Sequence, residues 1–178
     1  DLLSFVMDRL QVYLRDQGIR YDVVAASMRA GADDVVDVVA RGRALMRFVD
    51  TDAGANLLAA YNRADGICQK AKLDVNEIAS GSVRAVDPDL FELDAERDLF
   101  SAMQSLISQG EDARLRETES FNLFLQALSN LAAPVYQFFD KVMVNVDDKA
   151  VRDNRLAILS NLVFLMRKTG DLSRIVKG

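Results

Sequence analysis

Four polar side chains in the last third of the chain are spaced so that they could contact phosphate or a nucleobase. An apolar segment ends near Lys141 and Asn145, a tight polar turn follows, and the next predicted helix carries Arg152 and Arg155 in its first two turns. Helical residues three apart share a face, so the two arginines can point the same way. The alternative is local pairing, with Arg152 bonded to Asp148 and Arg155 to another helix.

The chain offers little for catalysis. It has no His and one Cys, which removes the commonest general base, the commonest zinc ligand and the Ser-His and Cys-His nucleophile pairs. It also lacks a P-loop and a dinucleotide-binding glycine pattern. The acidic pairs at 33–34 and 147–148 stand where helix N-termini favour negative charge. We therefore predict no catalytic residue, no metal site and no cofactor.

Aromatic residues could also hold an unpaired base. Tyrosines are the better candidates for stacking, because RNA readers use aromatic or arginine planes; they are Tyr13, Tyr21, Tyr61 and Tyr136. The phenylalanines at helical spacings are predicted to pack in the core; they are Phe121, Phe124, Phe138, Phe139 and Phe164.

Charge is distributed unevenly along the chain. The net charge of −5 argues against gripping a nucleic acid by bulk electrostatics. However, residues 87–134 hold ten acids and three bases (−7), residues 41–72 six bases and three acids (+3), and residues 135–178 eight bases and five acids (+3). A polyanion could dock on the two basic segments if they lie side by side. Alternatively, these charges only solvate outer helix faces.

Composition indicates a globular helical protein. Half of the 178 residues are apolar and 28% are charged, and no apolar run approaches the roughly 20 residues of a membrane helix. A lone Cys68 cannot form an internal disulfide, which favours the reducing cytoplasm. The chain begins at Asp1 without Met and is already helical in periodicity, which suggests a piece of a longer polypeptide.

Apolar residues recur at three- and four-residue spacings, and no stretch sustains strand alternation. This pattern predicts an all-α bundle of about seven to eight helices. The predicted helices span about 2–17, 21–30, 35–48, 52–72, 88–108, 112–131, 134–144 and 148–169. We predict a helical extension over 1–32 and a bundle over 33–178, with a connector at about 73–86.

The predicted helix ends depend on residues that favour caps and breaks. Thr51, Asp87 and Asp147 are suited to N-caps, Pro88 and Pro134 to first turns, and Gly18, Gly110 and Gly170 to C-terminal ends. A short polar tail is predicted after the last helix.

Several separated stretches resemble the C-terminal region of bacterial glycyl-tRNA synthetase beta subunits. They are FVMDRLQVYLRDQGIRYDVVAA, VVARGRALMRFVDTDAGANLLAAYNRADGI, AVDPDLFELDAERDLF and FFDKVMVNVDDKAVRDNRLAILSNLVFLMRKTGDLSRI. The last contains a D-x-A-V-R element, Asp148 to Arg152, similar to the DALR element, with Val151 where Leu is more usual. In YNRADGI, Asn62 and Gly66 stand where the family would have Lys and Asn.

The resemblance implies a non-catalytic, DALR-type anticodon-binding domain. It implies an enzyme whose separate alpha subunit activates glycine with ATP while the beta subunit holds the tRNA. The implied partners are glycine tRNA and the alpha subunit, with no DNA and no membrane, in the cytoplasm. The implied tRNA-binding residues are Lys141, Asn145, Arg152, Asn154 and Arg155 at one edge, and Arg41, Arg47, Arg63, Lys70 and Lys72 as a backbone-positioning set.

Two other interpretations stay open. The chain could be a structural domain that docks against other protein without contacting RNA, which a large exposed apolar patch with no basic surface beside it would favour. It could also be an unrelated helical adaptor that binds a partner helix. Basic segments on opposite faces would favour the adaptor.

Overall fold

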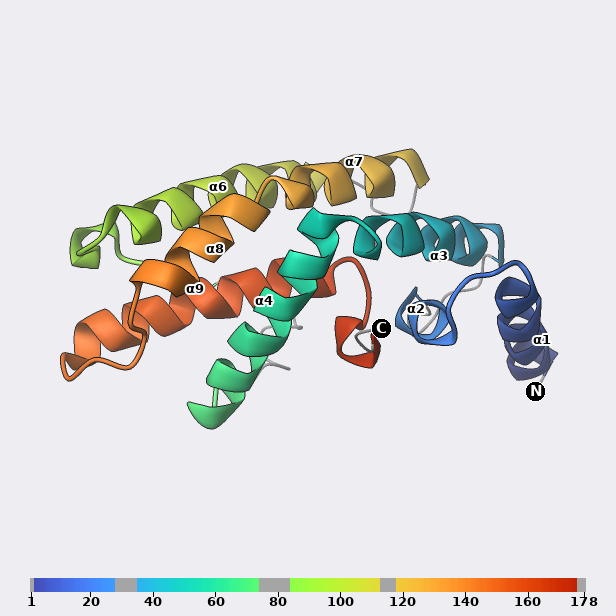
Figure 1. Cartoon of the computed structure of the whole chain (residues 1–178), viewed down its shortest axis with the longest axis horizontal. Coiled ribbons are helices and arrows are strands. Elements are labelled where there is room, and N and C mark those ends of the chain that lie inside the picture. Colours follow the sequence, from blue (N-terminus) through green and yellow to red (C-terminus); the bar gives the residue numbers. More distant parts are fainter. Residues whose placement is uncertain (1, 28–34, 74–83, 113–117, 176–178) are drawn as a thin grey trace.

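The computed structural model describes residues 2–27, 35–73, 84–112 and 118–175. Across these ranges the regular elements are all helical, as predicted, and none is a strand (Figure 1). They are α1 (Leu2–Asp16), α2 (Tyr21–Ser27), α3 (Val35–Val49), α4 (Asp52–Lys70), the 3-10 turn η1 (Pro88–Leu90), α6 (Asp94–Asp112), α7 (Thr118–Ser129), α8 (Ala132–Lys141), α9 (Lys149–Arg167) and the 3-10 turn η2 (Leu172–Arg174). In the described part of the chain, no helix is both long and apolar enough to cross a membrane.

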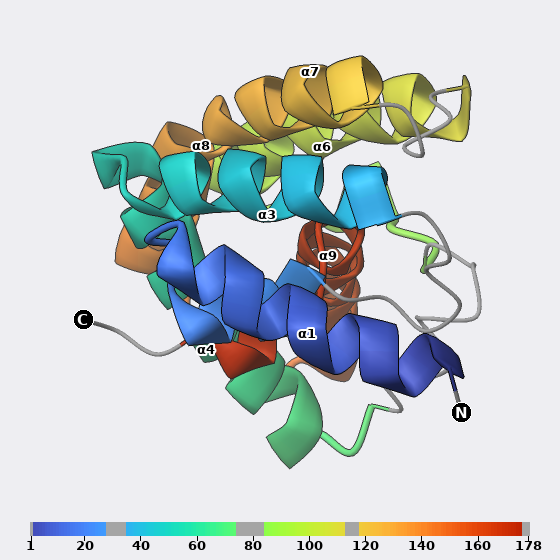
Figure 2. The ribbon, with the colours of Figure 1, turned by 90° about the vertical axis from the view of Figure 1, so that its right-hand side faces the viewer.

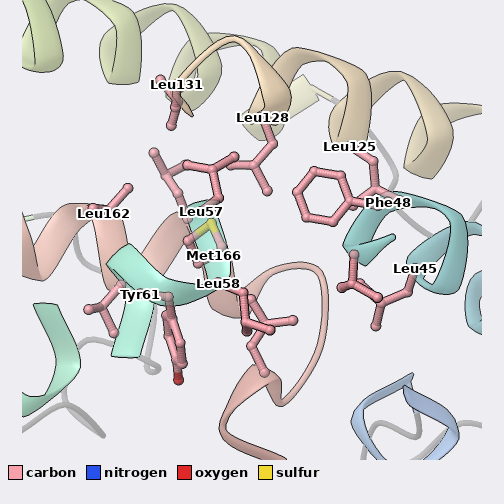
Figure 3. Close-up of a cluster of buried hydrophobic side chains, with 14 of the residues drawn as sticks. Leu45, Phe48, Leu57, Leu58, Tyr61, Leu125, Leu128, Leu131, Leu162 and Met166 are labelled. Carbon is pink, nitrogen blue, oxygen red and sulfur yellow. The ribbon is translucent and has the colours of Figure 1, made fainter. Parts of the chain in front are cut away.

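Helix α9 forms the centre of the bundle. It packs against α4 and α6 and touches η1, and its residues from Ala157 to Val163 are all buried. Figure 3 shows Leu162 and Met166 of α9 meeting apolar side chains of α3, α4 and α7. Full burial of one such side chain contributes roughly 1.5 to 3 kcal/mol relative to exposure. The burial of every residue in this middle part of α9 therefore makes the helix the main support of the fold.

The corner between α3 and α4 follows the predicted cap. Thr51 is the N-cap of α4: its Oγ1 accepts a hydrogen bond from the Gly54 amide at 3.0 Å and donates one to the Phe48 carbonyl at 2.7 Å. The two helices approach so closely that a Cβ on Gly54 would stand 1.9 Å from the Phe48 oxygen. A glycine in the first turn of α4 is thus required by packing.

The helix predicted to begin at Pro88 begins six residues later. Asp87 caps as expected, but only the turn η1, and α6 starts at Asp94. The delay has a local cause: the Glu96 carboxylate accepts hydrogen bonds from the amides of Glu92 and Leu93 at 3.0 and 2.9 Å. That reach of a third-position glutamate back to the preceding amides fixes the N-terminus of α6 there.

Other predicted ends also differ from the structure. Helix α7 ends at Ser129 and not at 131, and α8 spans Ala132–Lys141 and not 134–144, so that Pro134 lies within its first turn. Helix α6 continues through Gly110 to Asp112, because one glycine inside a helix costs only about 1 kcal/mol. Asp148, and not Asp147, caps α9, accepting from the amides of Ala150 and Val151 at 2.8 and 3.1 Å. The segment after Gly170 is also more than a polar tail, since η2 buries Leu172 and Ile175.

The ends of α1 and α4 lie close to those predicted. Gly18 follows α1 with φ +82°, the left-handed conformation expected after a helix. Helix α4 ends at Lys70, and Lys72 takes the left-handed position of its C-terminal cap, φ 55°. Most of the predicted connector at 73–86, the acidic pair at 33–34 and the end of the predicted second helix lie outside the described residues.

The lone cysteine is enclosed by the core and is expected to resist modification. Burial first, and the nearby Asp65 second, raise the pKa of the Cys68 thiol to about 11. The thiol therefore stays protonated up to that pH in the native protein, and the reactive species is the thiolate. We expect a disulfide reagent at pH 8 to label native protein at least about 100-fold more slowly than urea-unfolded protein, because labelling requires opening of the core. Equal rates would contradict this burial.

Candidate nucleic-acid interface

A groove of about 820 Å³ lies where α4, the C-terminal end of α8 and the N-terminal part of α9 meet. Five of the ten residues predicted to bind tRNA line it; they are Arg63, Lys70, Lys141, Asn145 and Arg152. They come from positions up to 89 apart in sequence (152 − 63 = 89). The fold thus gathers half of the predicted set at one place.

Each groove residue has a defined origin. Arg63 and Lys70 are seven residues apart on α4, which is two helical turns and hence one face. Lys141 is the last residue of α8, Asn145 lies in the loop that follows, and Arg152 is in the first turn of α9. Helix α4 contacts both α8 and α9. The basic segments 41–72 and 135–178 are therefore side by side, as polyanion docking requires.

Two arginines of α9 hold the loop over 142–148 against that helix. Arg152 Nη1 donates to the Val146 carbonyl at 2.8 Å, and Arg155 Nη1 donates to the Met143 carbonyl at 3.0 Å. Together with the Asp148 cap, these bonds hold both ends of the loop that carries Asn145. The backbone that carries Asn145 is thus positioned before any ligand arrives.

The groove is electropositive and partly apolar. It contains four cations and two carboxylates, Asp140 and Asp153 (4 − 2 = +2), and Asp153 already accepts from Lys149 at 2.7 Å. Among the described residues, the four cations form no salt bridge. Apolar side chains complete the lining; they are Ile67, Ala71, Phe139, Val142, Met143, Val144 and Leu156. Cations beside apolar surface suit single-stranded nucleic acid, which presents both phosphates and exposed bases.

Arg155 was predicted to contact RNA, and the structure gives it another role. Its side chain is 3% exposed: Nε donates to Glu96 at 2.8 Å and Nη2 to Glu92 at 2.7 Å. Glu96 is itself 0% exposed. Burial would raise the pKa of Glu96, but hydrogen bonds from Arg155 and two backbone amides outweigh it and hold that pKa below its ordinary value. Arg155 is therefore a buried structural cation.

Asn154 is likewise structural. Its Oδ1 accepts from the Asp87 amide at 2.8 Å, and its Nδ2 donates to the Asp87 carbonyl at 2.9 Å. Asn161, two turns further along α9, makes the same pair of bonds to Arg84 at 2.8 and 2.9 Å. The two amides bind the chain that leads into η1, and neither is directed to a ligand.

The rest of the predicted positioning set is dispersed. Arg41 is buried, with its guanidinium 4.7 Å from the centre of the Phe121 ring. Arg47 and Lys72 are exposed but do not line the groove. Among the tyrosines, Tyr61 is buried and its hydroxyl accepts from Arg167 at 3.3 Å, whereas the other three are exposed.

Two groove residues were missed from sequence. Phe139, predicted as core, is half-buried in the groove lining, and Met143 is 71% exposed there. Helical spacing carries no signal for either, because α4 completes the groove and lies about 70 residues earlier in the chain.

An all-α bundle with a cationic groove between its helices fits a helical nucleic-acid-binding domain. The chain belongs to the DALR anticodon binding domain family, whose profile matches residues 57–175. All five predicted residues that line the groove fall within this match.

Curated relatives carry the name glycine–tRNA ligase beta subunit. Those of Cereibacter sphaeroides and Dinoroseobacter shibae are 39% and 40% identical over 177 residues, which is 98% of this chain. That of Desulforamulus reducens is 38% identical over 176 residues, or 99% of this chain. In each case the match covers 24% of the relative, so the chain spans about a quarter of its relatives' length.

Proposed function

We propose that this chain recognises the anticodon arm of glycine tRNA through the groove, as part of the beta subunit of a cytoplasmic glycine–tRNA ligase. The family match and the relatives' names support the enzyme and the tRNA. The observation that carries the proposal is the convergence of four cations from α4, α8 and α9 with Asn145 of the loop between α8 and α9. Lys70 and Lys141 supply affinity through phosphates, and Asn145 and Arg152 supply base choice.

The domain would act by orientation alone. The proposed partner is an alpha subunit that activates glycine with ATP, so the reacting end of the tRNA lies away from the groove. Holding the anticodon arm places that end correctly, which lowers the barrier by removing translational and rotational freedom beforehand.

The test is binding of glycine tRNA and of an anticodon-substituted tRNA across a salt series. We expect Lys141→Ala to weaken both complexes and to reduce the slope of log K against log salt by about 1. Asn145→Ala should weaken the cognate complex more, by about 1 to 3 kcal/mol, and so relax the preference. Arg15→Ala is the control, because Arg15 is an exposed cation of α1, at the other end of the molecule from the start of α9 (Figure 1). Equal wild-type binding to both tRNAs would overturn the proposal.

A docking role is the second candidate, and one observation favours it. Helix α1 leaves large apolar side chains exposed, among them Phe5 at 57% and Tyr13 at 52%. Figure 2 shows α1 at the near end of the molecule, with α9 behind it. Absence of salt-dependent tRNA binding would favour this role. Basic segments on opposite faces would have favoured the adaptor interpretation, but the helices that carry them are in contact.

A further inference from the structure

We propose that Arg63 is a stacking platform for one unpaired base of the bound RNA, and not only a phosphate contact. This inference rests on the proposed function and specifies the chemistry of one part of the groove. It assigns Arg63 a role different from the backbone contact expected from its charge.

The position of Arg63 is fixed by an aromatic ring. Its guanidinium carbon lies 4.4 Å from the centre of the Phe139 ring. Phe139 in turn meets Phe138 edge to face, with ring centres 5.8 Å apart at 84°, and Phe138 is completely buried. The core thus holds Phe138, Phe138 supports Phe139, and Phe139 supports the guanidinium. Arg63 itself remains exposed and lines the groove.

A guanidinium in this setting suits a base better than a phosphate. It is planar and delocalised and is less strongly hydrated than an ammonium, so it stacks on flat rings. Among the described residues it has no carboxylate partner. The neighbouring lining includes Ile67 and Leu156, which cannot bind phosphate but can cover a base. Lys70 and Lys141 are left to bind the flanking phosphates as point charges.

The experiment places 2-aminopurine at each position of the anticodon loop in turn and measures its fluorescence with the 178-residue chain. One position should change its emission on binding because the base stacks. Arg63→Lys keeps the charge and loses the plane, so it should abolish that change and lower affinity about 5- to 150-fold. The slope against salt should stay as in the wild type, because the number of cations is unchanged.

An abasic nucleotide at the responsive position gives an independent readout. It should weaken the wild-type complex and leave the Arg63→Lys complex unchanged, since that variant has already lost the stack. Arg15→Lys, at an exposed cation of α1 outside the groove, is the matched control and should bind as the wild type does. Circular dichroism of each variant checks the fold.

The failure of the Arg63 platform and the failure of the proposed function give different results. If Arg63→Lys binds as the wild type does while binding stays salt-dependent and anticodon-specific, the platform is overturned and the proposed function survives. If the wild type shows no anticodon-dependent binding, both are overturned. A 2-aminopurine response that persists in Arg63→Lys would also overturn the platform, whatever the affinity.

Discussion

Replacing Arg155 with alanine is expected to lower the free energy of unfolding by about 3 to 5 kcal/mol, because it leaves the fully buried Glu96 without its cation. A domain of this size is usually stable by only about 5 to 15 kcal/mol. Urea unfolding followed by circular dichroism would measure the loss.

Two further variants separate the effect of the Arg155–Glu96 ion pair from that of apolar packing at the same place. Arg155→Met combined with Glu96→Leu should recover part of the stability, because a buried ion pair contributes little beyond an apolar pair of similar volume, while the amides of Glu92 and Leu93 still lose their acceptor. Lys149→Ala, which removes a pair whose two side chains are exposed, should leave stability nearly unchanged. An Arg155→Ala variant as stable as Lys149→Ala would refute the structural role.

The same pair predicts a dependence of stability on pH. The native pKa of Glu96 lies below its ordinary value, so the unfolded chain takes up a proton at higher pH than the native protein does. The contribution of Glu96 is therefore complete above the unfolded value of about 4.3, and it is lost as the pH falls through the lower native value. The stability difference between wild type and Glu96→Gln should shrink over that acid range.

Gly54→Ala and Gly66→Ala are expected to change stability in opposite directions, although both glycines lie in α4. A Cβ at residue 54 would meet the Phe48 carbonyl oxygen at 1.9 Å and force the α3–α4 corner apart. Such overpacking costs about 1 to 3 kcal/mol or more. A Cβ at residue 66 has no atom within 4 Å, so alanine there should stabilise the helix by about 0.5 to 1 kcal/mol.

Chemical denaturation of the two variants tests the pair directly, with Gly66→Ala as the control for helix propensity. If Gly54→Ala were as stable as Gly66→Ala, the close approach of α3 and α4 would be wrong. The corner sets the position of α4, which carries Arg63. A destabilised corner should therefore also weaken RNA binding.

The local features of the fold could be predicted from sequence. Apolar spacing indicated every α-helix that the structure describes, and Thr51 and Gly18 mark ends where capping chemistry places them. The Asp87 cap was also right, yet it begins only a turn. The position at which the α-helix starts is decided by Glu96. Its carboxylate accepts from the amides of residues 92 and 93, and these bonds compete with an earlier helix start.

The groove could be predicted in part. The corner with Lys141, Asn145 and Arg152 is local in sequence, so spacing alone brought these residues together. Arg155 and Asn154 looked equivalent to Arg152, but their partners lie 59 and 67 residues away. Nothing in the pattern near residue 155 indicates a buried carboxylate on another helix. Only the tertiary structure separates the half-buried Arg152, which lines the groove, from the buried Arg155.

The contact between the two ends of the chain affects how the domain can be made. The Asp171 amide donates to the Ala26 carbonyl at 2.9 Å, and a Cβ on Gly170 would stand 2.4 Å from the same oxygen. These partners are 145 residues apart (171 − 26 = 145). During synthesis, the buried face of α2, with Val23 and Val24, must wait for almost the whole domain before η2 covers it. Every residue that lines the groove precedes 157, so the contact between η2 and α2 is the last of these features to become available during synthesis.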